Sequence, residues 1–411
     1  MHKLSKRNLF VTLLVGASFS ILSLLLHILP SFNSMINFKD STGDNLTRFF
    51  SDDYIGTVVN LHKDHPVFAR RPLTTFFTDL IADYTFLSIA ESFSLVNFSL
   101  IFFSGLLVFY IARLLKYDYK ESLLSLILFC SSFTILLPFF RTTYTYDEPF
   151  QYFFFLLTLV ALLEERWLFF LLSFFLSLLG RETSAIAFLG VYLFMLIDIR
   201  KITIDKLLIK NTLVVVVPIL GYVLYYLFTN DSTLMKDYDE TNVRLSQFQY
   251  NFQDYQYTKE SLSLFLITLG IPFYSLVWYL RDHPIKGYEK KILNAFWFVF
   301  ILNTIIIIIS VRVNESRVIA LPLLLLWPLA GKYFRHLLSD IKNKIKTLSL
   351  LYLFSINIFF AFISYFIAFE VYQPTGSLMS ENLFNEYFFG LLLFVGFHLS
   401  VKLGVIISNK H

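Results

Sequence analysis

The stretch 174-FFLSLLGRETSAIAFLGVYLF-194 carries an arginine and a glutamate inside an otherwise apolar run. Charged side chains that face lipid are costly, so this pattern predicts two membrane helices joined by a turn that faces protein or a water-filled cleft. The flanking segments, 167–180 and 183–199, are both shorter than the roughly 20 residues that a span needs. We therefore expect the shared turn to lie below the membrane surface, in a pocket of a helical bundle.

The composition indicates a polytopic membrane protein. Of the 411 residues, 56% are hydrophobic and only 16% are charged, and soluble domains do not have this composition. We expect an all-α fold, a polytopic transmembrane helical bundle that forms a single integral membrane domain over residues 1–411. About 12 spans are predicted, over residues 9–29, 93–115, 121–140, 149–163, 167–180, 183–199, 211–229, 262–280, 292–310, 318–334, 348–369 and 387–407.

Charge placement predicts the topology. With both termini in the cytoplasm, the loops on that side hold 22 of the 34 basic residues and 9 of the 30 acidic ones. This asymmetry agrees with the positive-inside rule and predicts a multi-pass protein of the plasma (inner) membrane. The outer side then carries two long loops, 30–91 and 230–261, together with the turns at 181–182 and 312–318.

The first outer loop contains a helical pattern. Pro72 opens an amphipathic helix predicted over 72–90, because apolar residues recur at three- and four-residue steps from Leu73 to Tyr84. Such a helix is expected to lie along the outer membrane interface. Arg70 and Arg71 precede its positive end, which indicates a seat for a phosphate group. Binding of lipid headgroups is an equally good interpretation of the two arginines.

These features resemble the multi-span GT-C glycosyltransferases. The resemblance rests on the acidic loop after the first span, on 65-HPVFARRPL-73 before the predicted interfacial helix, and on 178-LLGRETSAI-186 and 314-NESRVIALPLLLLWPLA-330. It implies a sugar donor on a polyprenyl phosphate at the outer face and a glycan, lipid or protein acceptor. It also implies an acidic residue of the first outer loop that acts as catalytic base or orients the acceptor. Membrane lipids are further expected partners, and no nucleic acid is expected.

The expected chemistry needs a carboxylate and fixed positive charges. The carboxylate takes the proton of the attacking hydroxyl, and arginine stabilises the phosphate that leaves. We predict Asp53 or Asp52 as the base, with Asp40 as a further candidate in the same loop. Capping of a helix or turn is the alternative role for these aspartates.

Further candidate substrate-binding residues lie at predicted span ends on the outer side. Asp147 and Glu148 either cap and complement the next helix or bind acceptor hydroxyls or a divalent cation. Within the GRET turn, Glu182 is expected to orient Arg181 or to cap the following helix, and Arg181 to face the lipid phosphate. An internal ion pair is the alternative. The complete predicted set is Arg70, Arg71, Arg141, Asp147, Glu148, Arg181, Glu182, Glu315 and Arg317.

Metal binding is left unassigned, and no cofactor is predicted beyond the divalent cation mentioned above. His62, Asp64 and His65 lie too close together for a typical zinc site and lack a second ligand pair. Two other functions remain open on the sequence alone. A transporter or flippase of polysaccharide or lipid-linked oligosaccharide suits twelve spans equally well. An O-antigen-type polymerase would share the lipid-phosphate chemistry and the outer arginines.

Overall fold

The computed structural model describes residues 10–11, 14–18, 21, 52–64, 66–135, 147–197, 206–229, 248–310, 319–371 and 384–408. The regular elements in these ranges are all helical, which confirms the predicted all-α class. They are α2 (Asp52–Asp64), α3 (Pro66–Ala69), α4 (Pro72–Tyr84), α5 (Ile89–Leu114), α6 (Tyr119–Cys130), α8 (Glu148–Leu163), α9 (Trp167–Gly180), α10 (Ser184–Val191), the π-helical turn η1 (Tyr192–Leu196), α11 (Lys206–Thr229), α13 (Tyr255–Asp282), α14 (Gly287–Ser310), α16 (Leu323–Ile345), α17 (Leu350–Tyr365), the π-helical turn η4 (Phe366–Val371) and α18 (Phe384–Ser408).

Six of the described helices are long and apolar enough to cross a membrane. These are α5, α11, α13, α14, α17 with η4, and α18. Three further apolar segments are shorter, namely α8, α9 and α10 with η1. The protein is therefore an integral membrane protein by its helices, and six spans are supported by length where twelve were predicted. The first predicted span, 9–29, lies mostly outside the described residues.

Local capping residues set several helix bounds that differ from the prediction. The helix predicted over 72–90 ends at Tyr84, and a new helix starts at Ile89 because Ser88 and Glu91 form a capping box. Asp254 accepts a hydrogen bond from the backbone N–H of Tyr257 and starts α13 inside the predicted loop 230–261. Within the predicted span 121–140, α6 ends at Cys130, and residues 136–140 lie outside the described residues.

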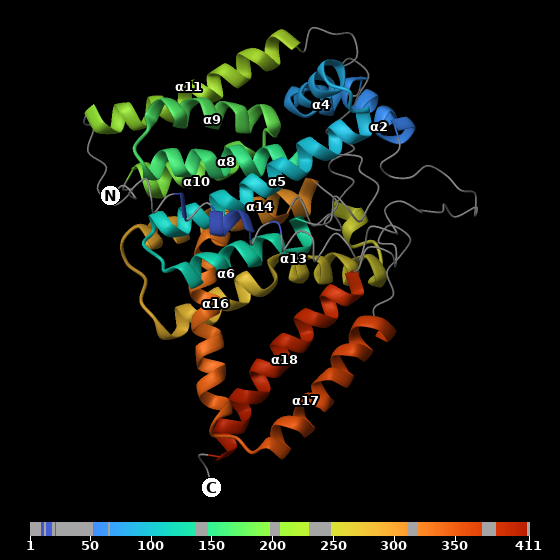
Figure 1. Cartoon of the computed structure of the whole chain (residues 1–411), viewed down its shortest axis with the longest axis vertical. Coiled ribbons are helices and arrows are strands. Elements are labelled where there is room, and N and C mark those ends of the chain that lie inside the picture. The colour runs from blue at the N-terminus through green and yellow to red at the C-terminus, as the bar shows by residue number, and fades with distance from the viewer. Residues whose placement is uncertain are drawn as a thin grey trace.

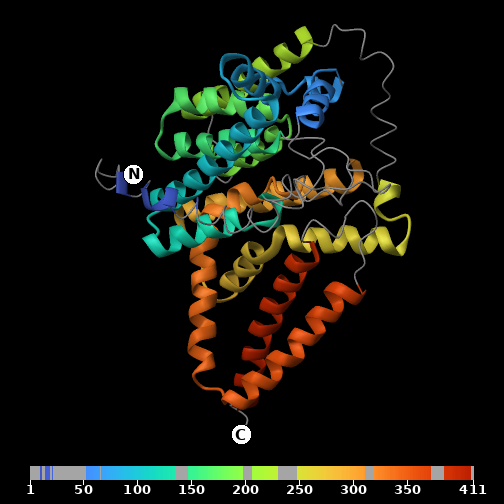
Figure 2. The ribbon, with the colours of Figure 1, turned by 45° about the vertical axis from the view of Figure 1, so that its right-hand side comes forward.

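The helices form a group at one end, a layer across the middle and a hairpin at the opposite end (Figure 1). At one end α8, α9 and α11 lie beside α5, with α2 and α4 at the same edge. Beneath them α6, α13 and α14 cross the molecule, and α16 runs from this layer toward the opposite end. There α17 and α18 form a hairpin that extends away from the rest, as the turned view in Figure 2 also shows.

The core lies between α5, α6, α8 and α16. Trp327 of α16 is fully buried, and its ring centroid lies 4.9 Å from that of Phe129 and 6.1 Å from that of Tyr152. Beside it, Gly331 brings α16 against the backbone of α6, where a Cβ would overlap the carbonyl oxygen of Glu121. The Gly331 backbone N–H donates to Ser125 Oγ over 2.9 Å. Close backbone approach at a glycine is a usual way to join helices in membranes.

The first testable prediction concerns the sidedness of the two ends. Phe86, between α4 and α5, is 96% exposed, and Lys286, between α13 and α14, is exposed as well. The charge asymmetry puts Phe86 outside and Lys286 inside. In a Cys130→Ser background, we expect Phe86→Cys to react with an impermeant maleimide in intact cells and Lys286→Cys to react only after permeabilisation. Reaction of both in intact cells, or the reverse order, would contradict the predicted topology.

Candidate functional site

Charged side chains from three separate segments meet where α4, α8 and the α9–α10 turn come together. We call Arg71, Asp147, Glu148, Arg181 and Glu182 the charged cluster. Arg71 precedes the first residue of α4, Asp147 and Glu148 stand at the start of α8, and Arg181 and Glu182 follow α9. All five belong to the predicted substrate-binding set, so the structure brings together residues that lie up to 111 positions apart in the sequence.

Arg71 is the centre of this cluster. Its Nη1 donates to Asp147 Oδ2 over 2.6 Å, while Nε and Nη2 donate to the two carboxylate oxygens of Glu182 over 2.9 and 2.7 Å. The side chain is 6% exposed. Pairing with two carboxylates offsets the cost of burying a guanidinium, and the two parallel bonds to Glu182 are the strongest form of this contact.

Asp147 does not cap α8, although the sequence allowed that role. It occupies the N-cap position with helical backbone angles, and its side chain makes no capping hydrogen bond. Instead, Oδ2 accepts from Arg71 and Oδ1 accepts from the hydroxyl of Thr74 over 3.2 Å. His62 Nδ1 lies 3.7 Å from Oδ1. The carboxylate is fully buried, and it therefore holds Arg71 from the inner side of the cluster.

Arg181 pairs with a different acid from the one predicted. Its Nη1 donates to Oε1 of Glu148, on α8, and the predicted pairing of Arg181 with Glu182 is therefore wrong for this contact. The reason is Arg71, which enters from the preceding loop and takes both oxygens of Glu182. Glu148 is 1% exposed and Arg181 is 12% exposed, so this second pair is also largely buried.

Polar residues that the sequence analysis did not select hold the turn in place. Gln151 Nε2, one turn into α8, donates to the hydroxyls of Thr183 and Ser184, each over 3.0 Å. Ser177 Oγ donates to the same Ser184 hydroxyl over 2.9 Å. Nothing in the local pattern marks the serine and threonine residues, because small hydroxyl residues are common in membrane helices. Gln151 follows Asp147 by one helical turn, and this spacing is the only signal available.

The other predicted arginine next to α4 has a different surrounding. The Arg70 guanidinium lies over the ring of Tyr226, on α11, at 4.7 Å from the ring centroid. A cation over an aromatic face is stabilised when it is shielded from water. His62, considered above only as a metal ligand, is buried and stacks on Phe68 with ring centroids 4.6 Å apart. Both residues thus help to pack the segment before α4 against its neighbours.

The predicted catalytic aspartates lie away from the cluster. Asp52 Oδ1 accepts from the backbone N–H of Ala90 over 3.0 Å, and this hydrogen bond lowers the pKa of Asp52. Asp53 is exposed on the same first turn of α2. His62, which contacts the cluster, lies nine residues further, or about 13 Å along the helix. Asp52 thus takes the alternative, structural role here, and a catalytic role for either aspartate stays a prediction.

Four predicted site residues lie outside the described residues. These are Asp40, Arg141, Glu315 and Arg317. Within the described ranges, no group of three or more His, Cys, Asp and Glu side chains is arranged to hold a metal ion. Asp147 and Glu148, which were considered for a divalent cation, both bind arginine instead.

The electrostatics of the cluster favour ionised carboxylates. Partial burial raises the pKa of Glu182, but the charge and hydrogen bonds of Arg71 outweigh this effect and leave the pKa well below its usual value. Glu182 is therefore negative at neutral pH. Its side chain is 34% exposed, whereas that of Asp147 is fully buried. Arg71 consequently has one fully buried partner, Asp147, and one partly exposed partner, Glu182.

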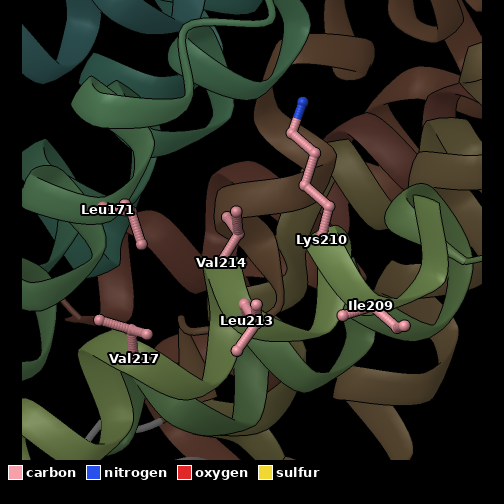
Figure 3. Close-up of a pocket in the computed structure, with 6 residues that line it drawn as sticks. All are labelled: Leu171, Ile209, Lys210, Leu213, Val214 and Val217. Carbon is pink, nitrogen blue, oxygen red and sulfur yellow. The ribbon is translucent and has the colours of Figure 1, made fainter. Parts of the chain in front are cut away.

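A cavity between α9 and α11 has aliphatic walls and a single charged lining residue. It has a volume of about 310 Å³ and is lined by Leu171, Ile209, Lys210, Leu213, Val214 and Val217. Figure 3 shows five aliphatic side chains and the ammonium end of Lys210 extending away from Leu213 and Val217. Lys210 lies over the ring of Trp167. With one polar group among its lining residues, this cavity suits an alkyl chain rather than a reacting group.

Comparisons with known proteins identify no relative. A scan against models of protein families finds no matching family, and a search of curated proteins finds no match for this chain. Function is therefore inferred below from the residues and geometry of the charged cluster.

The pairing of Arg181 with Glu148 gives a second prediction. Arg181→Gln removes the arginine from a buried carboxylate, and we expect a loss of about 3–5 kcal/mol in the free energy of unfolding. Adding Glu148→Gln should restore part of it, whereas adding Glu182→Gln should not, because Glu182 belongs to Arg71. Thermal unfolding of the purified variants measures the loss and the recovery of stability. The control is Arg335→Gln, whose partly exposed pair with Asp118 is worth about 0–1 kcal/mol. Equal recovery with either glutamine would contradict the pairing.

The lowered pKa of Glu182 gives a third prediction, on acid stability. Because the pKa is lower in the folded than in the unfolded protein, Glu182 contributes stability above its unfolded value near 4.5. That contribution is lost as the pH falls through the folded pKa. We expect the melting temperature of the wild type to fall below about pH 4.5 more steeply than that of Glu182→Gln. Identical acid slopes in the two proteins would show that Arg71 does not stabilise the ionised carboxylate.

Proposed function

We propose that this chain is a membrane glycosyltransferase that moves a sugar from a polyprenyl-phosphate donor to a glycan, lipid or protein acceptor at the outer membrane face. The observation that carries this proposal is the geometry of Arg71. The buried carboxylate of Asp147 fixes the guanidinium, and a partly exposed carboxylate occupies its remaining fork. A phosphate presents oxygens with the spacing that this fork binds.

The charge balance explains how a phosphate enters. Two guanidiniums, of Arg71 and Arg181, face three carboxylates in the cluster. The phosphodiester of the donor carries one negative charge, so it is accepted only if a carboxylate leaves. Glu182 is the most exposed of the three, so in this proposal the donor phosphate replaces it on Nε and Nη2 of Arg71. Arg71 keeps its bond to Asp147 and does not need to move.

The displaced carboxylate has the properties of a general base. Once Glu182 leaves Arg71, the interaction that lowered its pKa is gone, and it lies beside the bound phosphate. In the reaction, the acceptor oxygen bonds to the anomeric carbon and the bond from that carbon to the phosphate oxygen breaks. The electron pair stays on the polyprenyl phosphate, which Arg71 stabilises, and the acceptor proton passes to Glu182.

The surface of α4 supports a position at the membrane interface. Thr74 and Thr78 are fully buried toward the bundle, while Phe76 is 55% exposed and Tyr84 is 83% exposed. Leu73 is buried on the same side as these threonines, and Phe77 also packs against the bundle. The exposed aromatic residues suit a helix lying on lipid. We place α4 and the cluster at the outer face of the plasma (inner) membrane, in a chain of about twelve spans with cytoplasmic termini.

A transporter of lipid-linked oligosaccharide is the second candidate, and one observation favours it. Helix α13 is interrupted at Gly270, whose φ of +46° is not helical, and Pro272 follows two residues later. Transporters use broken helices near the middle of the membrane to line their substrate paths. The charged cluster has no role in that interpretation, so the two functions differ in what happens when its residues change.

The fourth prediction tests the transferase. Full-length protein in proteoliposomes is offered polyprenyl phosphates carrying different single labelled sugars, together with glycan, lipid or protein acceptors. Free polyprenyl phosphate and sugar transferred to the acceptor are measured. We expect Glu182→Gln to lower turnover about 10²–10⁴-fold while donor affinity is unchanged or tighter, because a competing carboxylate is gone. Arg71→Lys should weaken donor binding, since lysine offers no fork.

Asp79→Asn serves as the matched control, because Asp79 lies on α4 but pairs with Lys63 outside the cluster. It should retain wild-type turnover. Unreduced turnover in Glu182→Gln would exclude Glu182 as the base. Uptake of labelled lipid-linked oligosaccharide without release of polyprenyl phosphate would favour the transporter instead.

A further inference from the structure

The break in α13 opens a cavity that the proposed reaction does not use. Gly270 takes a φ of +46° and ψ of −148°, which a residue with a side chain rarely adopts. Next to it lies a cavity of about 520 Å³, a size typical of sites for small organic ligands. Its walls come from the end of α6, the middle of α13 and the first turns of α18, with Ser131 and Ser132 following α6.

A buried threonine lies at the wall of this cavity. Thr268 is 1% exposed and lines the cavity, and among the described residues its Oγ1 has no hydrogen-bond partner. The backbone carbonyl of Thr268 lacks its usual helical donor as well, because Pro272, four residues later, has no N–H. Unsatisfied polar groups inside a protein cost free energy, so Thr268 indicates a ligand that forms hydrogen bonds here.

The lining of the cavity defines the chemistry of that ligand. The lining residues with polar side chains are Ser131, Ser132, Thr268, Tyr387 and Glu386. Among the described residues that line it, no lysine, arginine or histidine is present. An anion would therefore lack any positive partner. The remaining walls are aliphatic and aromatic, and they are Leu128, Phe133, Ile267, Ile271, Leu391 and Phe394, with Gly270, Pro272 and Gly390.

We propose that this cavity binds a neutral amphiphile that combines several hydroxyl groups with an alkyl chain, such as a sugar linked to a lipid. The hydroxyls of the ligand donate to Glu386 and Thr268, and its apolar part packs on the aromatic walls. This is a binding site distinct from the charged cluster, since no residue of that cluster lines it. It does not rest on the proposed transfer reaction, because binding is measured without turnover.

The test uses full-length protein in nanodiscs and octyl β-D-glucoside carrying a photoreactive diazirine in its alkyl chain. Labelled peptides are identified by mass spectrometry. We expect labels on the segments around 128–133, 267–272 and 386–394. Unlabelled octyl β-D-glucoside should compete with the probe, whereas octyl phosphate and octane should not. Equal competition by octyl phosphate would overturn the proposal through the charge argument, and equal competition by octane would show that an alkyl chain alone fills the cavity.

Two variants separate binding from folding. A side chain at Gly390 would extend into open space, so Gly390→Phe fills the cavity without a clash and should reduce labelling at least about tenfold. Thr268→Val keeps the shape but removes the hydroxyl, and should weaken competition by octyl β-D-glucoside about three- to tenfold.

Each variant has a matched control elsewhere in the chain. Gly56→Phe on α2 also extends into open space, and Thr258→Val on α13 removes a hydroxyl that already bonds to Asp254 O. Neither control should change labelling. Unchanged labelling in Thr268→Val and Gly390→Phe, or equal losses in the controls, would overturn the site.

Discussion

A buried guanidinium must be neutralised where it lies, and Arg71 imposes this requirement on the first half of the molecule. Its partners come from the start of α8 and from the turn after α9. Because a salt bridge inside a low-dielectric core tolerates little displacement, these contacts fix α4 against α8 and against the α9–α10 pair. Short helices such as α9, of 14 residues, need neighbours of this kind, since their own length does not cross a bilayer.

The same constraint separates a rigid from an adjustable side of the site. Asp147 is held by Arg71, by Thr74 and by the nearby ring of His62, all buried. Glu182 accepts side-chain hydrogen bonds from Arg71 at both carboxylate oxygens, and it reaches solvent. Chemistry that exchanges one anion for another requires such an arrangement, because the fixed side preserves the position of the cation while its partner on the open side is replaced.

The sequence pattern selected the residues of the cluster but paired Arg181 with the wrong acid. Charges at the ends of apolar runs are unusual enough to select Arg71, Asp147 and Glu182. Which arginine meets which acid depends on helix rotation and on the path of the loop before α4, and neither is encoded in spacing. The bounds of α9 agree with the prediction because charges flank an uninterrupted apolar run. The broken helix α13 was missed, since Gly270 and Pro272 interrupt no hydrophobic pattern.

The contact between Arg71 and Glu182 also determines an order of events during synthesis. These residues are 111 positions apart, so at roughly 5–20 residues per second Arg71 leaves the ribosome about 6–22 s before Glu182. Asp147 arrives between them. Until both carboxylates have been synthesised, Arg71 lacks its full set of buried partners and has to remain in water. The segment that carries α4 therefore cannot dock on the bundle before that point. Docking of α4 is therefore a late step, which completes only after the α9–α10 turn has been inserted.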